Sequence, residues 1–373
     1  MRKAHLTGND LELLKKRIVI ISLLTWLPLL ILSMLAGNAW SGAVELPFIK
    51  DIEVHVRFLV ALPVMIAAEL MVHERLRLVV GMFERNNLIP QDKVNQFRET
   101  IASAFRWRNS YVAEFLMVVI IYVIGYNVVW QKSMAVETTA WFTDPAAGKG
   151  NLSLAGIWFR YVSLPVFQFL FLRWYYRIFI WVRFLFQISA IKFRLSPVHP
   201  DHVGGLGFIS NIVFAFMPLA FMHGVVLAGM IANHIFHEGT TLLDYKIEII
   251  VIVAVILLLV IVPLFVFSSQ LTEAKRNGIL HYGLLATQYG QEFEAKWIHH
   301  SVAKSGELLG SADIRSLADL QQAFSVVRNM NMVPIARSDI FMLVAATIAP
   351  VAPLLLTMMP LSDIIKLVAG MLF

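Results

Sequence analysis

The chain has 373 residues, of which 58% are hydrophobic and only 15% charged, and it contains no cysteine. A soluble domain carries roughly 25% charged residues, so this composition indicates an integral membrane protein. It also excludes disulfides, a thiolate nucleophile and a cysteine-ligated metal. The formal net charge of +6 is better explained by basic loops on the cytoplasmic side of a membrane than by nucleic acid, which we do not expect as a partner.

Apolar segments long enough to cross a bilayer recur along the chain. The first follows a basic N-terminus, and its length of about 20 residues favours an uncleaved membrane helix over a signal peptide. The pattern predicts an all-α polytopic membrane helix bundle of about seven spans with helical cytoplasmic extensions. The predicted spans are 18–37, 58–73, 111–130, 154–172, 207–235, 247–268 and 340–360.

Lysine and arginine predict the orientation. With the N-terminus in the cytoplasm, 24 of the 31 basic residues lie in the inside segments 1–17, 74–110, 173–206 and 269–339. Basic residues cross a membrane at high cost, so we expect the N-terminus to be cytoplasmic.

Three parts of the chain follow from this topology. They are a transmembrane bundle over 1–268 with cytoplasmic loops 74–110 and 173–206, a helical cytoplasmic segment over 269–338, and a last span with a C-terminal helix over 339–373.

Each cytoplasmic part is expected to contain helices. Loop 74–110 has a proline followed by apolar residues at helical spacing. Loop 173–206 opens with a basic, aromatic run that is typical of an interfacial helix lying beside a span. The segment 269–338 is predicted to continue the sixth span as one long helix, then to form a second helix that Pro334 ends.

Three stretches, "HPDHVGGLGF", "SADIRSLADLQQAFSVVRNM" and "APLLLTMMPLSDIIKLVAGMLF", resemble a family of bacterial multi-pass inner-membrane proteins of uncharacterised function. The resemblance runs from about the first span to the C-terminus. It implies a location in the bacterial inner (plasma) membrane. It implies no activity, no cofactor and no catalytic residue.

The stretch "SPVHPDHVGGLGFIS" at 196–210 offers possible metal ligands in His199, Asp201 and His202. They make a partial ligand set, and the two prolines impose an extended or turn geometry that points neighbouring side chains different ways. The favoured interpretation is structural. The prolines end a helix, Asp201 or His202 caps the turn, and the glycines allow close packing of the backbone.

The same stretch is a candidate anion site. Its "GLGFIS" lacks the preceding strand of a nucleotide-binding fold, but free N–H groups at the start of the fifth span favour an anion such as a lipid phosphate. The candidates there are Gly204, Gly205 and Gly207. Arg173 and Arg177 are expected to reach anionic lipid headgroups from their interfacial segment.

His223 is the first candidate for a pathway through the membrane. It lies near the middle of the fifth span, where an ionisable side chain is costly and usually faces a cavity or a partner, and Pro218 precedes it by about one turn. The competing interpretation is close helix packing, because small residues recur at every fourth position. These residues are Ala220, Gly224, Ala228 and Ala232.

Further pathway candidates lie in the second and the last span. Glu69 and His73 share one helix face at i, i+4, either as an interfacial pair or as the lining of a vestibule. Pro350 and Pro353 break the hydrogen-bond ladder of the last span, which marks either a pore-lining helix or a bent packing helix.

No nucleophile elbow, Walker lysine motif or catalytic carboxylate pair is present, so an enzyme is the least supported class and no cofactor is expected. The first expectation is a channel-like or transport protein for ions or small solutes, acting as a homo-oligomer in contact with anionic lipids. One alternative is a membrane scaffold or sensor acting through its cytoplasmic helices. A third is a metal-dependent membrane enzyme.

Overall fold

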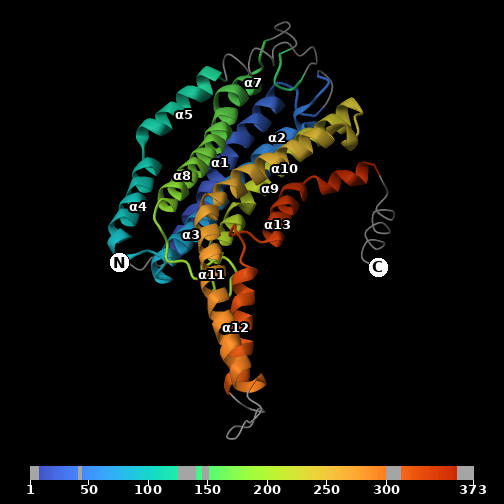
Figure 1. The fold of residues 1–373 in the computed structure, drawn as a ribbon. Helices are drawn as coiled ribbons and strands as arrows, with labels where there is room; N and C mark the ends of the chain where they lie inside the picture. Colours follow the sequence, from blue (N-terminus) through green and yellow to red (C-terminus); the bar gives the residue numbers. More distant parts are fainter. Residues whose placement is uncertain (1–7, 41–43, 125–139, 145–150, 300–311, 359–373) are drawn as a thin grey trace.

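The structure, a computed structural model, describes residues 8–40, 44–124, 140–144, 151–299 and 312–358. Within these ranges the regular elements are helices, with no β-strand beyond isolated bridges (Figure 1). Five helices are long and apolar enough to cross a membrane, which indicates a membrane-embedded helical bundle. They are Glu12–Leu35, Ile52–Arg85, Leu154–Ser189, Gly207–Glu238 and Leu242–Ile298.

Several of these long helices consist of consecutive segments. A π-helical turn separates α2 from α3 and α7 from α8 without interrupting the helix, and a 3-10 turn joins α10 to α11. The bounds are α1 Gly8–Leu35, α2 Ile52–Val56, α3 Leu62–Arg85, α7 Leu154–Trp158, α8 Leu164–Ser189, α9 Asn211–Glu238, α10 Lys246–Ile261 and α11 Ser268–Phe293. The shorter helices are α4 Val94–Arg108, α5 Tyr111–Ile124, α12 Ala312–Arg328 and α13 Arg337–Ile348.

The expected count of seven spans is not confirmed. The predicted span 111–130 corresponds to α5, and its residues after 124 lie outside the described ones. The predicted span 340–360 is divided: α13 ends at Ile348, and a separate 3-10 helix covers Ala352–Thr357. Pro350 lies in the gap, where it can donate no backbone hydrogen bond and would clash with the carbonyl four residues earlier.

The predicted interfacial helix of loop 173–206 is not a separate element. Residues Leu154–Ser189 form one helix of 36 residues, which is about 54 Å long at 1.5 Å per residue and so exceeds the roughly 30 Å hydrocarbon core. No helix breaker lies between Pro165, in the first turn of α8, and Pro197. The span therefore continues straight through the basic, aromatic run.

The helices predicted within 74–110 and 269–338 are present. α4 follows Pro90 and buries Phe97. α11 continues the helix of α10, and α12 returns along it, so that the two form a hairpin projecting from the bundle (Figure 1). Near the far end of this hairpin, Asp313 of α12 accepts hydrogen bonds from Lys296 and Trp297.

α9 is the central helix of the bundle. In its most apolar 18-residue stretch 67% is buried, against 22–39% in the corresponding stretches of the other four long helices. It packs on α2, α3, α10 and α13. The small residues at every fourth position of α9 are all buried, and their size lets neighbouring helices approach closely. They are Ala220, Gly224, Ala228 and Ala232. At Gly224 the backbone of α13 comes so close that an added Cβ would lie 1.9 Å from the carbonyl oxygen of Thr347.

Gly224→Ala is expected to destabilise the bundle, because the new methyl group must push α13 away from α9. Overpacking of this kind costs about 1–3 kcal/mol, and a lower midpoint of thermal unfolding in a neutral detergent measures it. Gly81→Ala is the matched control: an added Cβ at Gly81 meets nothing within 4 Å, and alanine is the better helix former. Equal unfolding midpoints in the two variants would contradict the packing described for Gly224.

Candidate functional site

Asp201 organises the turn between α8 and α9. Its carboxylate accepts hydrogen bonds from the backbone N–H groups of Val203 (2.9 Å), Gly205 (3.1 Å) and Gly207 (2.8 Å), and it lies 2.8 Å from Nδ1 of His199. Burial raises the pKa of Asp201, but these hydrogen bonds outweigh burial and hold the pKa below its ordinary value. The carboxylate is thus an internal anion at the N-terminal end of the fifth predicted span.

The segment 190–210, here called the junction, also holds the base of the α11–α12 hairpin. The N–H of Asn331 donates to the carbonyl of His202 over 2.7 Å, and Lys275 donates to the carbonyl of Met330 over 2.8 Å. Gly204 has a φ of +68°, and an added Cβ there would lie 3.1 Å from the side chain of Met330. The stretches "HPDHVGGLGF" and "SADIRSLADLQQAFSVVRNM" therefore contact each other through Gly204 and Met330.

Neither a metal site nor an external anion site is built in the junction. Among the described residues, no group of three or more His, Asp or Glu side chains is placed to hold a metal ion. Gly204, Gly205 and Gly207 are the glycines expected to bind a lipid phosphate. The N–H groups of Gly205 and Gly207 already donate to Asp201. The structural interpretation of this stretch is the one that the geometry supports.

His223 is buried and satisfied on both ring nitrogens. Nδ1 lies 2.7 Å from the carbonyl of Leu219, and Nε2 lies 2.7 Å from the hydroxyl of Tyr175 on α8. The ring of Phe171 packs beside it with centroids 5.1 Å apart. The histidine therefore links α9 to α8, and α9 continues through Pro218 without a break.

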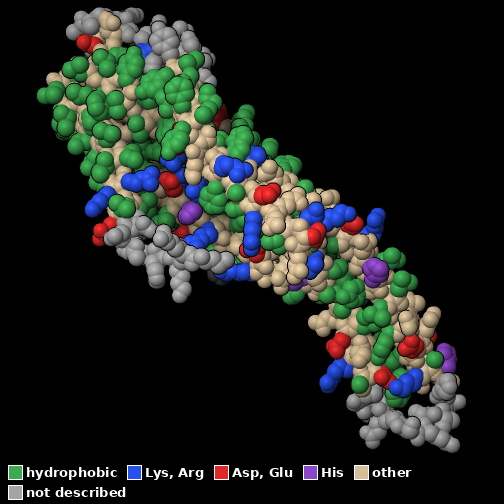
Figure 2. Space-filling view, turned by 90° about the vertical axis from the view of Figure 1, so that its left-hand side faces the viewer, with side chains coloured by type: hydrophobic (Ala, Val, Ile, Leu, Met, Phe, Trp, Pro, Cys, Tyr) green, Lys and Arg blue, Asp and Glu red, His purple; other side chains and the backbone are tan. Residues whose placement is uncertain are grey.

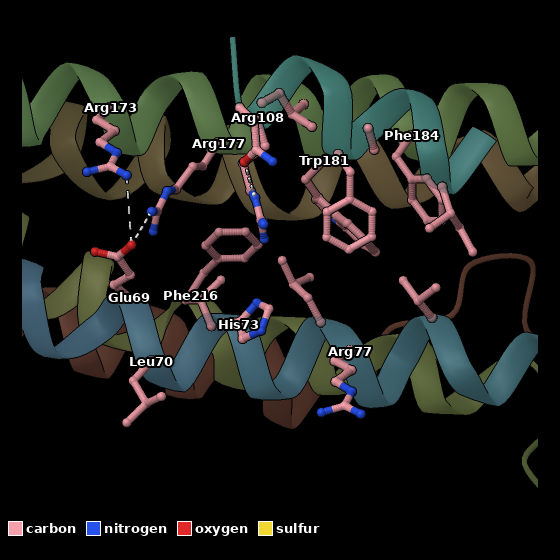
Figure 3. Close-up of a pocket in the computed structure, with 18 of the residues that line it drawn as sticks. Glu69, Leu70, His73, Arg77, Arg108, Arg173, Arg177, Trp181, Phe184 and Phe216 are labelled. Carbon is pink, nitrogen blue, oxygen red and sulfur yellow. Dashed lines mark hydrogen bonds and ion pairs between the residues drawn. The ribbon is translucent and has the colours of Figure 1, made fainter. Parts of the chain in front are cut away.

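A large cavity with a volume of about 1100 Å³ lies between α1, α3, α4 and α8, and residues of α5 and α9 complete its wall. Glu69, His73, Arg173 and Arg177 line it, which brings four of the sequence candidates together (Figure 3). His223, Pro218, Pro350 and Pro353 are not among its lining residues. Three further arginines line it that the sequence did not single out: Arg17, Arg77 and Arg108.

Glu69 is the centre of an ion-pair cluster at one end of the cavity. Its carboxylate pairs with Arg177 at 2.5 Å, Arg17 at 3.4 Å and Arg173 at 4.0 Å. These arginines come from α1 and α8, so the cluster ties three helices together. The Arg177 guanidinium also lies over the ring of Trp174, 5.2 Å from its centroid.

Positive charge in the cavity exceeds negative charge. Five arginines and two glutamates, Glu69 and Glu114, line it. Within the described part of the chain, neither Arg77 nor Arg108 forms an ion pair with a carboxylate. Arg108 contacts the neighbouring Asn109 and the ring of Phe105, and in Figure 3 its guanidinium projects into the space between α3 and α8. Arg108 is therefore an exposed cation in the cavity with no carboxylate partner among the described residues.

The surface around the cavity marks a change in polarity. Figure 2 shows apolar side chains covering one end of the molecule, with basic, acidic and histidine side chains gathered where this covering ends. The glutamate–arginine cluster lies on the parts of α1, α3 and α8 where apolar sequence gives way to charged sequence. An amphipathic boundary of this kind is where lipid headgroups lie.

Little in the sequence indicates that Arg17 and Arg108 belong to a functional site. Both lie in segments counted as basic loops flanking a span, and basic residues at such positions are explained by topology alone. Their common cavity depends on how α4 folds back against α3 and α8, which no local pattern specifies.

Comparison with known proteins gives no match: no family model, no curated protein and no solved structure is significantly similar to the chain.

Asp201→Asn is expected to destabilise the protein, because the amide carries no charge and directs a donor at backbone N–H groups. Hydrogen bonds to charged groups contribute about 1.5–3 kcal/mol, and the midpoint of thermal unfolding at neutral pH measures the loss. Since the folded-state pKa of Asp201 is lowered, its stabilisation is present above its ordinary pKa and is lost as the pH falls through the folded value. The difference in unfolding midpoint between the native protein and Asp201→Asn should accordingly become smaller below about pH 4. A difference in unfolding midpoint that stays constant with pH would show that the carboxylate charge does not stabilise the junction.

Proposed function

We propose that this protein is a membrane transport protein that carries an anionic substrate, and that the substrate binds in the cavity between α1, α3, α4 and α8. The observation that supports this most directly is the excess of arginine over glutamate in a cavity large enough for a ligand. Guanidinium groups bind phosphates and carboxylates by paired hydrogen bonds. Ligands of membrane helix bundles commonly bind between helices.

The remaining features of the proposal come from the sequence. In this account the protein has about seven spans, including α5 and the proline-broken segment after α13, and belongs to the bacterial inner-membrane family that it resembles. The N-terminus is cytoplasmic, which places the opening of the cavity on the cytoplasmic side. A homo-oligomer remains part of the proposal, with the lipid-facing helices supplying its interfaces.

The α11–α12 hairpin favours a second candidate, a scaffold or sensor. It projects beyond the bundle (Figure 1) and exposes large apolar side chains, among them Leu280, Leu284 and Leu285. Its base is hydrogen-bonded to the junction, so a partner bound to the hairpin would act on the α8–α9 turn. In that case the protein would capture a soluble partner without moving any solute.

Transport of an anion is tested with purified protein in phosphatidylcholine vesicles that hold inorganic phosphate in the lumen and a fluorescent anionic phospholipid in the inner leaflet. We expect one of these anions to cross at a rate at least tenfold above that in protein-free vesicles. Arg108→Gln should reduce that rate severalfold, because the variant removes the exposed cation and keeps the length of the side chain.

Arg276→Gln is the matched control, since Arg276 is exposed on α11 and does not line the cavity. Its rate should equal that of the native protein. If neither anion moves faster than in protein-free vesicles, the transport proposal is refuted and the scaffold candidate takes its place.

A further inference from the structure

We infer that the cavity binds an anionic amphiphile, a molecule whose acidic phosphate headgroup is joined to a hydrocarbon chain. The inference rests on the proposed function and names its class of substrate. Three observations carry it: the size of the cavity, the division of its wall into a charged and an apolar part, and an unsatisfied hydrogen-bond donor in that wall.

The volume exceeds the needs of a small ion. Pockets of about 300–1,000 Å³ hold drug-sized ligands, and this cavity measures about 1100 Å³. A free inorganic anion bound at the arginines would leave most of that space to water against apolar walls. Hydration of apolar surface is unfavourable, by about 25 cal/mol for each Å² that a ligand would otherwise cover. A hydrocarbon chain fills the space and removes this surface from water.

Along both α3 and α8, the side chains that line the cavity change from charged to apolar toward the C-terminal end of the helix. On α8, Arg173 and Arg177 are followed by Trp181 and Phe184, as Figure 3 shows. On α3, Glu69 and His73 are followed by the apolar lining residues Leu76 and Val80. Arg77 lies between these two in sequence, and its guanidinium points away from α8 in Figure 3.

Helix α4 adds further apolar residues to this second part of the wall. They are Ile101, Ala104 and Phe105. Charge and hydrocarbon are thus separated in the cavity as they are in an amphiphile, with Arg108 of α4 reaching the boundary between them (Figure 3).

The indole N–H of Trp181, a residue of this wall, is buried and unsatisfied within the described part of the chain. The Trp181 side chain lines the cavity and is 6% exposed, and its N–H has no hydrogen-bond acceptor among the described residues. An unsatisfied buried N–H is costly. A phosphate or ester oxygen of the amphiphile, lying between Arg177 and the apolar part, satisfies it after a small shift of the ring.

Native mass spectrometry of the full chain in a neutral maltoside detergent tests the inference by equilibrium titration. Four probes are compared: dioctanoyl phosphatidic acid, dodecyl phosphate, dioctanoyl phosphatidylcholine and inorganic phosphate. We expect phosphatidic acid to bind at least tenfold more tightly than phosphatidylcholine, whose chains are the same and whose headgroup has no net charge. Arg108→Gln should weaken phosphatidic acid at least fivefold, while Arg276→Gln leaves it unchanged.

The other probes identify the source of the ligand. Dodecyl phosphate binding as tightly as phosphatidic acid assigns the site to single-chain amphiphiles, and weaker binding assigns it to diacyl lipids of the bilayer; both support the inference. Inorganic phosphate binding as tightly as phosphatidic acid overturns it, as does equal binding of the two dioctanoyl lipids.

Binding and movement are measured separately, so the two proposals fail in different ways. Tight binding of phosphatidic acid without movement of any anion in vesicles refutes transport and leaves the ligand assignment standing. Movement of inorganic phosphate without preferential binding of phosphatidic acid refutes the ligand assignment alone.

Discussion

The carboxylate of Glu69 gathers three arginines from two other helices at the edge of the apolar part of the bundle. Long polar side chains at this depth must pair or reach water, because a lone charge beside hydrocarbon is costly. By pairing Arg17, Arg173 and Arg177, Glu69 fixes the spacing of α1, α3 and α8. That spacing, together with α4, creates the cavity. Of the two lining arginines that Glu69 does not pair, Arg77 and Arg108, the functional proposal rests on Arg108.

A second internal carboxylate plays the corresponding part at the junction. Asp201 takes up the N–H groups before α9 that would otherwise attract an anion, and the turn it stabilises is hydrogen-bonded to the base of the α11–α12 hairpin. In both anion sites expected from the sequence, a carboxylate of the chain takes the place of an external anion. Asp201 does so at the junction, and Glu69 does so beside Arg173 and Arg177. What distinguishes the cavity is that one glutamate does not neutralise all of its arginines.

Much of the helical architecture follows from the sequence. Hydropathy predicts the five long helices, and the small side chains around Gly224 predict the close packing of α9. The prediction fails where one local pattern is compatible with two structures. The basic, aromatic run after Arg173 can form a separate interfacial helix or extend a span, and its packing against the surrounding helices determines which of the two forms. His223 drew attention as an isolated histidine, yet Tyr175, distant in sequence, satisfies it. The cavity depends on the positions of six helices at once, because residues of α1, α3, α4, α5, α8 and α9 line it.

The most direct test of the account is an experimental structure of the protein in a nanodisc of phosphatidic acid and phosphatidylcholine, read for density in the cavity. The account predicts a phosphate within hydrogen-bond distance of Arg108 or Arg177 and a hydrocarbon chain running past Trp181 and Phe184. A cavity in which Arg108 has turned to pair with Glu114, with no lipid density beside it, would contradict it.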